Sequence, residues 1–320
     1  MERFFMASKT KIAIIGAGFV GASIAYTLAV QHAANEMVLI DVVPDKASGE
    51  VDDIKHGLCF LGEMDIYAGE YKDIKDCDII IMSAGANRKP GETRHDLAQK
   101  NVAIAKGITN EIMKYYNKGV IIVVANPVDI LTYMIAKWTG LPKGMVIGTG
   151  TALDSARFRS VLADLIGIDV VNVHGYIIGE HGDSQVAVWS NTHIAGTPIE
   201  KYCQRRGIPL TEEIKAQIHS QIKTSGASII KRKGATYYGI AACVSSLVKS
   251  VMQDKNTLRT VSSVMHGEFG LTDVAISLPN IVGASGAHNI FELDLTPLER
   301  EQLLASAAEC KEVLRSVDID

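Results

Sequence analysis

The chain has 320 residues, of which 47% are hydrophobic and 21% are charged, a balance typical of a globular protein with a sizeable core. Its net charge of −4 argues against a protein that coats nucleic acid, so we expect no nucleic-acid partner. The 5 cysteines are scattered and include no CxxC pair, which favours reduced thiols in a cytoplasmic protein over a disulfide framework or a thiolate metal site.

The first element lies in a stretch without formal charge, residues 12–35, which is long enough to suggest a membrane helix or a signal peptide. Its content argues against both. Gly16, Gly18 and Gly21 weaken a lone helix, and the isoleucine-rich run before them is typical of a short buried strand. A second uncharged run, residues 274–291, is interrupted by Pro279. We therefore expect no membrane segment and no targeting signal.

Strand-like and helix-like segments alternate through the first half of the chain. Short apolar runs predict strands at residues 11–15, 37–40, 65–68, 78–82 and 120–124. Longer segments predict helices at residues 22–31, 44–61, 94–116 and 128–138, with a polar loop over residues 83–93. Such alternation predicts an α/β fold with a doubly wound parallel sheet of the Rossmann type, covered by helices on both faces.

The pattern changes after about residue 150. Helices are expected at residues 152–166, at residues 211–251 with breaks near Gly226, Gly234 and Gly239, and from Thr296 to the end. Strands are expected at residues 170–178, 186–190, 258–265 and 274–281, the last two as an antiparallel meander. We therefore predict two tightly packed domains, an α/β domain over residues 1–149 and an α+β domain over residues 150–320.

A glycine motif lies between the first predicted strand and the first predicted helix. Gly16 permits a tight turn, Gly18 lets a pyrophosphate approach the backbone, and Gly21 lets the helix pack close to the strand. Asp41 ends the next strand, where a carboxylate accepts hydrogen bonds from the adenosine ribose and repels a 2′-phosphate. The motif predicts NAD as the cofactor; the alternative is a glycine-rich turn in another kind of α/β protein.

Three further segments carry chemistry: Ser-Ala-Gly-Ala-Asn-Arg-Lys-Pro-Gly-Glu-Thr-Arg at residues 83–94, Leu-Asp-Ser-Ala-Arg at residues 153–157, and Ile-Gly-Glu-His-Gly-Asp at residues 178–183. Together with the glycine motif they resemble the NAD-dependent lactate/malate dehydrogenase family, and in detail its bacterial L-lactate dehydrogenase branch. The resemblance runs from about Lys11 to the last helix. It implies an NAD-binding domain over residues 1–149 and a catalytic substrate domain over residues 150–320.

The resemblance implies a catalytic role for three residues. His181 becomes the general acid/base, a task suited to the side chain that titrates near neutral pH. Asp154 holds the other imidazole nitrogen and favours the protonated form. Arg157 clamps the substrate carboxylate, although an ion pair with Asp154 within the helix is the simpler alternative. Likewise, a lone histidine in a glycine loop is more often structural than catalytic.

The remaining site residues also follow from the resemblance. Arg94 polarises the substrate carbonyl when its loop closes, Asn126 hydrogen-bonds the nicotinamide side or the substrate oxygen, and Thr236 forms a wall of the substrate pocket. Alternatively, an arginine in this loop is a solvated surface residue without a role in the site. The hydride comes from the cofactor and the proton from His181, so we expect no metal.

Arg88 departs from the lactate pattern. Lactate dehydrogenases of this branch usually carry Gln at this position and malate dehydrogenases carry Arg, which suits the second carboxylate of oxaloacetate. Glu92, Thr236 and residues 148–154 are instead of the lactate type. We expect a preference for oxaloacetate and malate with residual pyruvate activity; the alternative is an L-lactate dehydrogenase, with or without activation by fructose 1,6-bisphosphate.

Arg159 and His174 match positions by which allosteric bacterial lactate dehydrogenases bind fructose 1,6-bisphosphate between subunits. Both side chains can be cationic and hold a phosphate across a two-fold axis of a homotetramer. Alternatively, Arg159 and His174 are ordinary residues of a subunit interface and bind no effector. Two other classes of protein are also considered: an idle NAD-binding redox sensor, which would lack a catalytic residue, and an NAD- and metal-dependent glycosidase, which needs a metal cluster absent from the sequence pattern.

Overall fold

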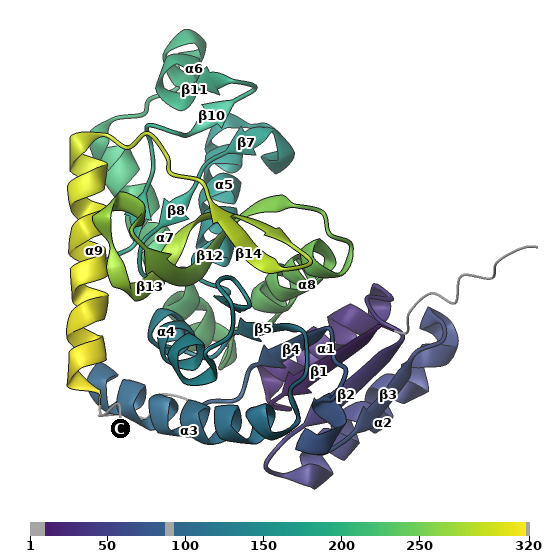
Figure 1. The fold of residues 1–320 in the computed structure, drawn as a ribbon. Coiled ribbons are helices and arrows are strands. Elements are labelled where there is room, and N and C mark those ends of the chain that lie inside the picture. Colours follow the sequence, from purple (N-terminus) through teal and green to yellow (C-terminus); the bar gives the residue numbers. More distant parts are fainter. Residues whose placement is uncertain (1–9, 87–92, 318–320) are drawn as a thin grey trace, which may run out of the picture.

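The computed structural model describes residues 10–86 and 93–317 and centres on a nine-stranded sheet (Figure 1). The strand order is β14-β13-β12-β6-β5-β4-β1-β2-β3, and the six strands from β6 to β3 are parallel. This 3-2-1-4-5-6 order is the doubly wound dinucleotide-binding arrangement. The parallel strands are β1 (Lys11–Ile15), β2 (Glu36–Ile40), β3 (Asp65–Ala68), β4 (Ile79–Met82), β5 (Val120–Val123) and β6 (Val146–Gly148).

Helices cover both faces of this sheet, because alternate strand residues point in opposite directions. In β1, Ile12 and Ile14 pack into one core with helices α1, α2 and α8. Ala13 and Ile15 pack into the other core with α3, α4 and α9. These helices are α1 (Phe19–Val30), α2 (Pro44–Leu61), α3 (Arg94–Tyr115), α4 (Val128–Thr139), α8 (Tyr238–Met252) and α9 (Pro297–Ser316). The predicted α/β fold class is confirmed.

The second half of the chain extends the same sheet. A meander of β12 (Thr257–His266), β13 (Thr272–Gly283) and β14 (Gly286–Ile290) joins antiparallel to β6 through Ser262 and Gly148. A third core around Phe158 contains residues of α5 (Ala152–Ile166), β7 (Val173–His174), β8 (Ile177–Ile178), β9 (Val186–Ala187), β10 (His193–Ile194), α6 (Ile199–Arg206) and α7 (Glu212–Lys233). The short strand β11 (Thr197–Pro198) pairs with β10, and short 3-10 turns lie at Tyr71–Ile74, Val170–Asn172 and Glu268–Gly270.

Some predicted elements of the second half differ from the structure. The single strand expected at residues 170–178 is a 3-10 turn followed by β7 and β8, with a break where Gly175 passes close to the Phe158 ring. The helix expected over residues 211–251 is interrupted only between α7 and α8. Gly226 lies inside α7 and Gly239 inside α8, because one glycine costs a helix only about 1 kcal/mol. The strands β6, β10, β11 and β14 and the helix α6 were not predicted.

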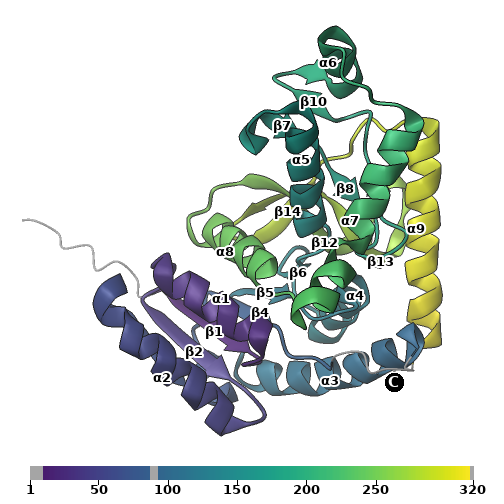
Figure 2. The same cartoon turned by 180° about the vertical axis from the view of Figure 1, so that it is seen from behind.

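The last helix begins as predicted. Thr296 caps α9, its hydroxyl accepting a hydrogen bond from the Glu299 N–H while the Glu299 carboxylate accepts one from the Thr296 N–H. From there α9 runs along the second half of the molecule until its C-terminal end reaches the start of α3 (Figures 1 and 2). In the part of the chain that the structure describes, we find no helix with the length and apolarity needed to cross a membrane.

The close approach of α1 to β1 yields a stability prediction. A Cβ at Gly21 would collide with the Gly16 carbonyl oxygen, so Gly21→Ala should cost about 1–3 kcal/mol through overpacking and lower the Tm. Gly49→Ala is the control, because this α2 position has open space and alanine favours a helix. Thermal unfolding of both variants checks this, and an unchanged Tm for Gly21→Ala would contradict the packing argument.

Candidate active site

The glycine turn between β1 and α1 is shaped for a close-lying anion. Gly16 has φ +106°, and a Cβ there would lie 2.7 Å from the Ala84 nitrogen. Gly18, by contrast, has no atom within 4 Å of the position a Cβ would take. It is the N-cap of α1 and supplies no side-chain cap, so the first-turn N–H groups of the helix have no side-chain partner there. The pyrophosphate of NAD fits this opening and the positive end of the helix dipole.

Asp41 is held at the carboxyl end of β2, beside this turn. Its Oδ2 accepts a hydrogen bond from the Ala17 N–H at 2.6 Å, and its Oδ1 accepts one from the Val43 N–H at 2.9 Å. The carboxylate is therefore fixed next to the glycine turn, where an adenosine ribose would lie. Residues from two strand ends thus fit the cofactor predicted from the sequence.

A buried carboxylate organises the predicted catalytic residues. Asp154 lies in the first turn of α5 and is 2% exposed. Its Oδ2 lies 2.6 Å from His181 Nδ1, and its Oδ1 accepts a hydrogen bond from Arg157 Nη1 at 2.9 Å. The helical ion pair considered as an alternative for Arg157 is therefore formed. It leaves the other guanidinium N–H groups able to bind a carboxylate.

These contacts shift the pKa values of both partners. Burial alone would lower the pKa of His181, but the negative charge and the hydrogen bond of Asp154 outweigh it, so the pKa lies above its usual value. Burial alone would raise the pKa of Asp154, but the charges of His181 and Arg157 hold it below its usual value. Nδ1 is engaged by Asp154, so Nε2 is the imidazole nitrogen that remains for proton transfer.

The loop that carries His181 is anchored from three elements. Its backbone N–H donates to Asp129 Oδ2 on α4 at 2.7 Å, and the Glu180 N–H donates to Ser306 Oγ on α9 at 2.8 Å. Gly179 exchanges backbone hydrogen bonds with Ser277 on β13. Asp129 is buried, and burial raises its pKa to about 6. The imidazole is thus presented by a loop with little freedom to move.

A cavity of about 610 Å³ opens beside His181. Asn126, which follows β5, lines it together with Pro127, Asp129 and residues of α9. The backbone carbonyl of Asn126 accepts a hydrogen bond from Asn101 Nδ2 at 2.6 Å. The carboxyl end of β5 therefore brings Asn126 to the same space as the imidazole, as expected for a ligand site in an α/β sheet.

Three further predicted site residues are Thr236, Arg94 and Arg88. Thr236 is on the segment between α7 and α8, and the start of α8 approaches α5 at Leu153, next to Asp154. Arg94 is the first residue of α3, but its side chain lies outside what the structure describes. Arg88 also lies outside the described residues.

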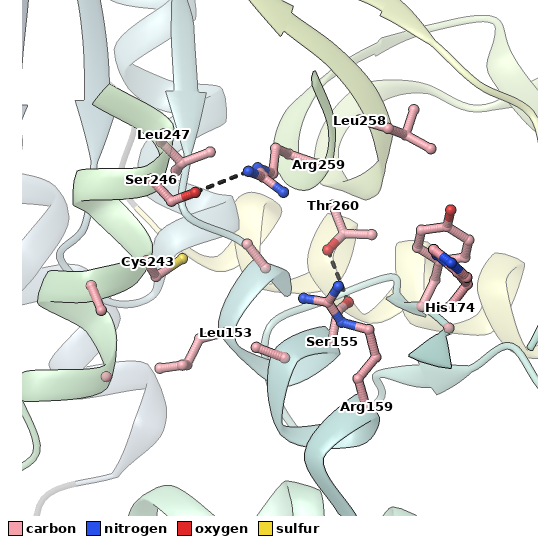
Figure 3. Close-up of a pocket in the computed structure, with 16 residues that line it drawn as sticks. Leu153, Ser155, Arg159, His174, Cys243, Ser246, Leu247, Leu258, Arg259 and Thr260 are labelled. Atoms are coloured by element: carbon pink, nitrogen blue, oxygen red, sulfur yellow. Dashed lines mark hydrogen bonds between the residues drawn. The ribbon is translucent and has the colours of Figure 1, made fainter. Parts of the chain in front are cut away.

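Arg159 and His174 line a second cavity of about 610 Å³ between α5, α8, β7 and β12 (Figure 3). Arg259 joins them, and its Nη2 donates to Ser246 Oγ at 2.9 Å. The Nε atoms of Arg159 and Arg259 are buried without a partner among the described residues. Burial, followed by the charge of Arg259, lowers the pKa of Arg159. The cavity thus contains cationic groups and no described counter-charge on its lining.

Comparison with known proteins decides the family. The model of the lactate/malate dehydrogenase NAD binding domain matches residues 10–148, and that of the alpha/beta C-terminal domain matches residues 151–318. The chain belongs to the lactate/malate dehydrogenase family. It is therefore an NAD-dependent 2-hydroxy-acid dehydrogenase, and NAD is its cofactor.

Similar proteins span the whole chain. An L-lactate dehydrogenase of Thermoanaerobacter sp. (strain X514) is 48% identical over 97% of this chain and 99% of its own length. The solved structure of a minor L-lactate dehydrogenase from Enterococcus mundtii, in the ligands-bound form, has a TM-score of 0.94 at 40% identity and covers 98% of this chain and 99% of its own. The L-lactate dehydrogenase structure from Clostridium thermocellum has a TM-score of 0.86 at 54% identity, with 97% and 100% covered.

Sequence reasoning missed several residues of this dehydrogenase site. Asp129 is the clearest, because it is the one carboxylate in the apolar run of residues 128–136, which was a visible sign of a functional constraint. Ser306 gave no comparable sign, since its partner Glu180 lies on a distant element, and neither did Arg259, which lines the second cavity. Among the described residues, no group of three or more His, Cys, Asp or Glu side chains is placed to hold a metal ion.

The Asp154–His181 contact is predicted to set the pH dependence of catalysis. In the general-acid role predicted for His181, reduction of a keto acid needs the protonated imidazole, so its rate falls as pH rises through the histidine pKa. Asp154→Asn removes the charge that raises this pKa, so the alkaline decline of kcat/KM should move to lower pH, with kcat reduced by about 100-fold. For hydroxy-acid oxidation, which needs neutral His181, the acid-side decline should move in the same direction.

The measurement is a pair of pH profiles in the two reaction directions. Asp129→Asn is the matched comparison, because Asp129 raises the pKa of His181 less than Asp154 does. We expect the pH profile of Asp129→Asn to move less than that of Asp154→Asn. Profiles of Asp154→Asn that coincide with those of the unmodified enzyme would show that the contact does not control the proton donor.

Proposed function

We propose that this protein is an L-lactate dehydrogenase, which interconverts pyruvate and L-lactate with NADH and NAD. The observation that carries the proposal is the set of curated relatives named L-lactate dehydrogenase, which are 44–48% identical over nearly the full chain. These relatives favour the alternative reading of the sequence, an L-lactate dehydrogenase, over the expected preference for oxaloacetate. The lactate-type residues Glu92 and Thr236 support the same proposal.

The site geometry supports specific roles in this reaction. Bound NADH supplies the hydride. His181 donates a proton from Nε2 to the substrate oxygen, while Asp154 stabilises the charged imidazole before transfer. Arg157, whose side chain is 19% exposed, uses its free N–H groups to bind the substrate carboxylate. Asn126 and Thr236 form part of the wall around the substrate, and Arg94 polarises the substrate carbonyl.

The proposal extends to the arrangement of the molecule. Residues 1–149 hold the cofactor through Gly16, Gly18, Gly21, Asp41 and Asn126, and residues 150–320 carry the substrate site. We place the enzyme in the cytoplasm as a homotetramer. The cavity of Figure 3 supports assembly, because Leu153, Leu247 and Leu258 line it beside two arginines that have no counter-charge on the described lining. A second copy covering this surface would bury the apolar groups and supply counter-charges.

Oxaloacetate reduction is the second candidate, and Arg88 is the residue that favours it. An arginine facing the variable end of the substrate pairs with a second carboxylate and disfavours a methyl group in a dry site. Such an uncompensated charge costs about 3–5 kcal/mol, or roughly two to four decades in kcat/KM.

Paired kcat/KM values for pyruvate and oxaloacetate with NADH separate the two candidates. We expect the larger value for pyruvate. Arg88→Gln should reduce oxaloacetate activity and increase pyruvate activity, because it removes the charge that a second carboxylate needs. A preference for oxaloacetate of about two decades or more, lost in Arg88→Gln, would instead identify a malate dehydrogenase on a lactate dehydrogenase scaffold.

Arg159 and His174 are also proposed to bind fructose 1,6-bisphosphate between subunits. The Nε of Arg159 is buried and has no partner among the described residues, and together with the nearby charge of Arg259 it favours a strongly anionic ligand. The sugar bisphosphate at millimolar concentration should lower the KM for pyruvate and increase the sedimentation coefficient. Arg159→Gln should abolish both effects, and Arg205→Gln, an exposed cation on α6, should preserve them. No response in the unmodified enzyme would refute regulation at this cavity.

A further inference from the structure

Four side chains form a cluster at the rim of the cofactor turn, called here the aromatic clasp: Phe19, Lys233, Tyr237 and Tyr238. The rings of Phe19 and Tyr237 are stacked, with centroids 5.5 Å apart and an angle of 23° between their planes. The Tyr238 ring meets Tyr237 edge to face at 4.4 Å. The Lys233 ammonium lies 3.6 Å from the Tyr237 centroid and 4.2 Å from that of Tyr238, within the range of cation–π attraction.

The aromatic clasp joins the two halves of the chain beside the cofactor opening. Phe19 is the first residue of α1, directly after Gly18, and the residue is 71% exposed. Tyr237 follows Thr236 and is the N-cap of α8. The helices α1 and α8 pack against each other on one side of the sheet (Figure 2). The contact between Phe19 and Tyr237 therefore links the glycine turn to the residue next to Thr236, the proposed wall of the substrate pocket.

Lys233 brings an available positive charge to this place. It is the last residue of α7, and no carboxylate in residues 10–86 or 93–317 forms an ion pair with it. Its interactions are with the two tyrosine rings, and its hydrogen bond to Tyr237 lowers the pKa of that tyrosine. A cation–π contact at an exposed site contributes only about 0.5–1 kcal/mol, so a phosphate competes for the ammonium.

We propose that Lys233 contacts the pyrophosphate of bound NAD, and that Phe19, Tyr237 and Tyr238 hold the lysine in position for it. The glycine turn supplies N–H groups from the first half of the chain but no side-chain cation of its own. The Lys233 ammonium contacts the Tyr237 ring, and this ring stacks on Phe19 at the start of α1. A lysine side chain is long and flexible, so the ammonium can move from the ring to a phosphate at the glycine turn.

The test is calorimetric binding of NADH, ADP-ribose and adenosine to the intact enzyme without keto acid. Lys233→Met should weaken NADH and ADP-ribose by the same factor, about three- to tenfold, because both contain the pyrophosphate. Adenosine lacks phosphate, and its affinity should not change. The loss should shrink as salt concentration rises, since screening weakens an exposed ionic contact. Lys233→Arg should restore most of the affinity.

Two matched controls separate this contact from a general effect. Lys231→Met removes a neighbouring cation of the same helix end that is not in the clasp, and it should leave NADH affinity unchanged. Phe19→Ala should weaken NADH as Lys233→Met does, whereas Tyr26→Ala, an exposed aromatic on the same helix, should not.

Unchanged NADH affinity in Lys233→Met would overturn the proposal, and so would an equal loss for adenosine. Because no substrate is present, neither result depends on whether pyruvate or oxaloacetate is preferred.

Discussion

The shared carboxylate of Asp154 is the contact on which the rest of the site depends. One buried side chain accepts a hydrogen bond from Arg157 and holds His181, so a single negative charge orients both the proposed substrate anchor and the proposed proton donor. A carboxylate that is 2% exposed is stable only when it is paired, and here the two cationic partners supply that pairing. The same pairing raises the pKa of His181 and keeps a proton available near neutral pH.

This contact requires that four elements meet accurately. Asp154 stands in the first turn of α5, whereas His181 lies on a loop that α4, α9 and β13 hold in place. The loop backbone is therefore bonded to the core on several sides, while the imidazole itself faces the cavity. Such support limits the conformations of His181 and reduces the entropy lost when substrate binds.

The single nine-stranded sheet brings the cofactor and substrate sites together. The parallel strands β1, β2 and β5 end at the glycine turn, Asp41 and Asn126, and the meander from the second half pairs with β6 of the same sheet. The two large cores also contain residues from both halves. The halves are therefore mechanically continuous. A contact such as the aromatic clasp acts between parts that already share a packed framework.

The sequence by itself determined the strand–helix alternation, the glycine turn and the capped last helix, because these depend on residues close together in the chain. It also identified His181, Asp154 and Arg157, through their resemblance to family motifs. The breaks in the second half were harder to predict, since packing against Phe158 interrupts one strand and a long helix tolerates Gly226.

Only the tertiary structure decided which distant residues meet. Asp129 and His181 are 52 residues apart in sequence, and nothing in either local pattern indicates their hydrogen bond. The same holds for Arg159 beside Arg259 and for Phe19 on Tyr237. Periodicity and turn chemistry report the conformation of a short segment, whereas these pairings depend on how complete elements pack, which no short segment encodes.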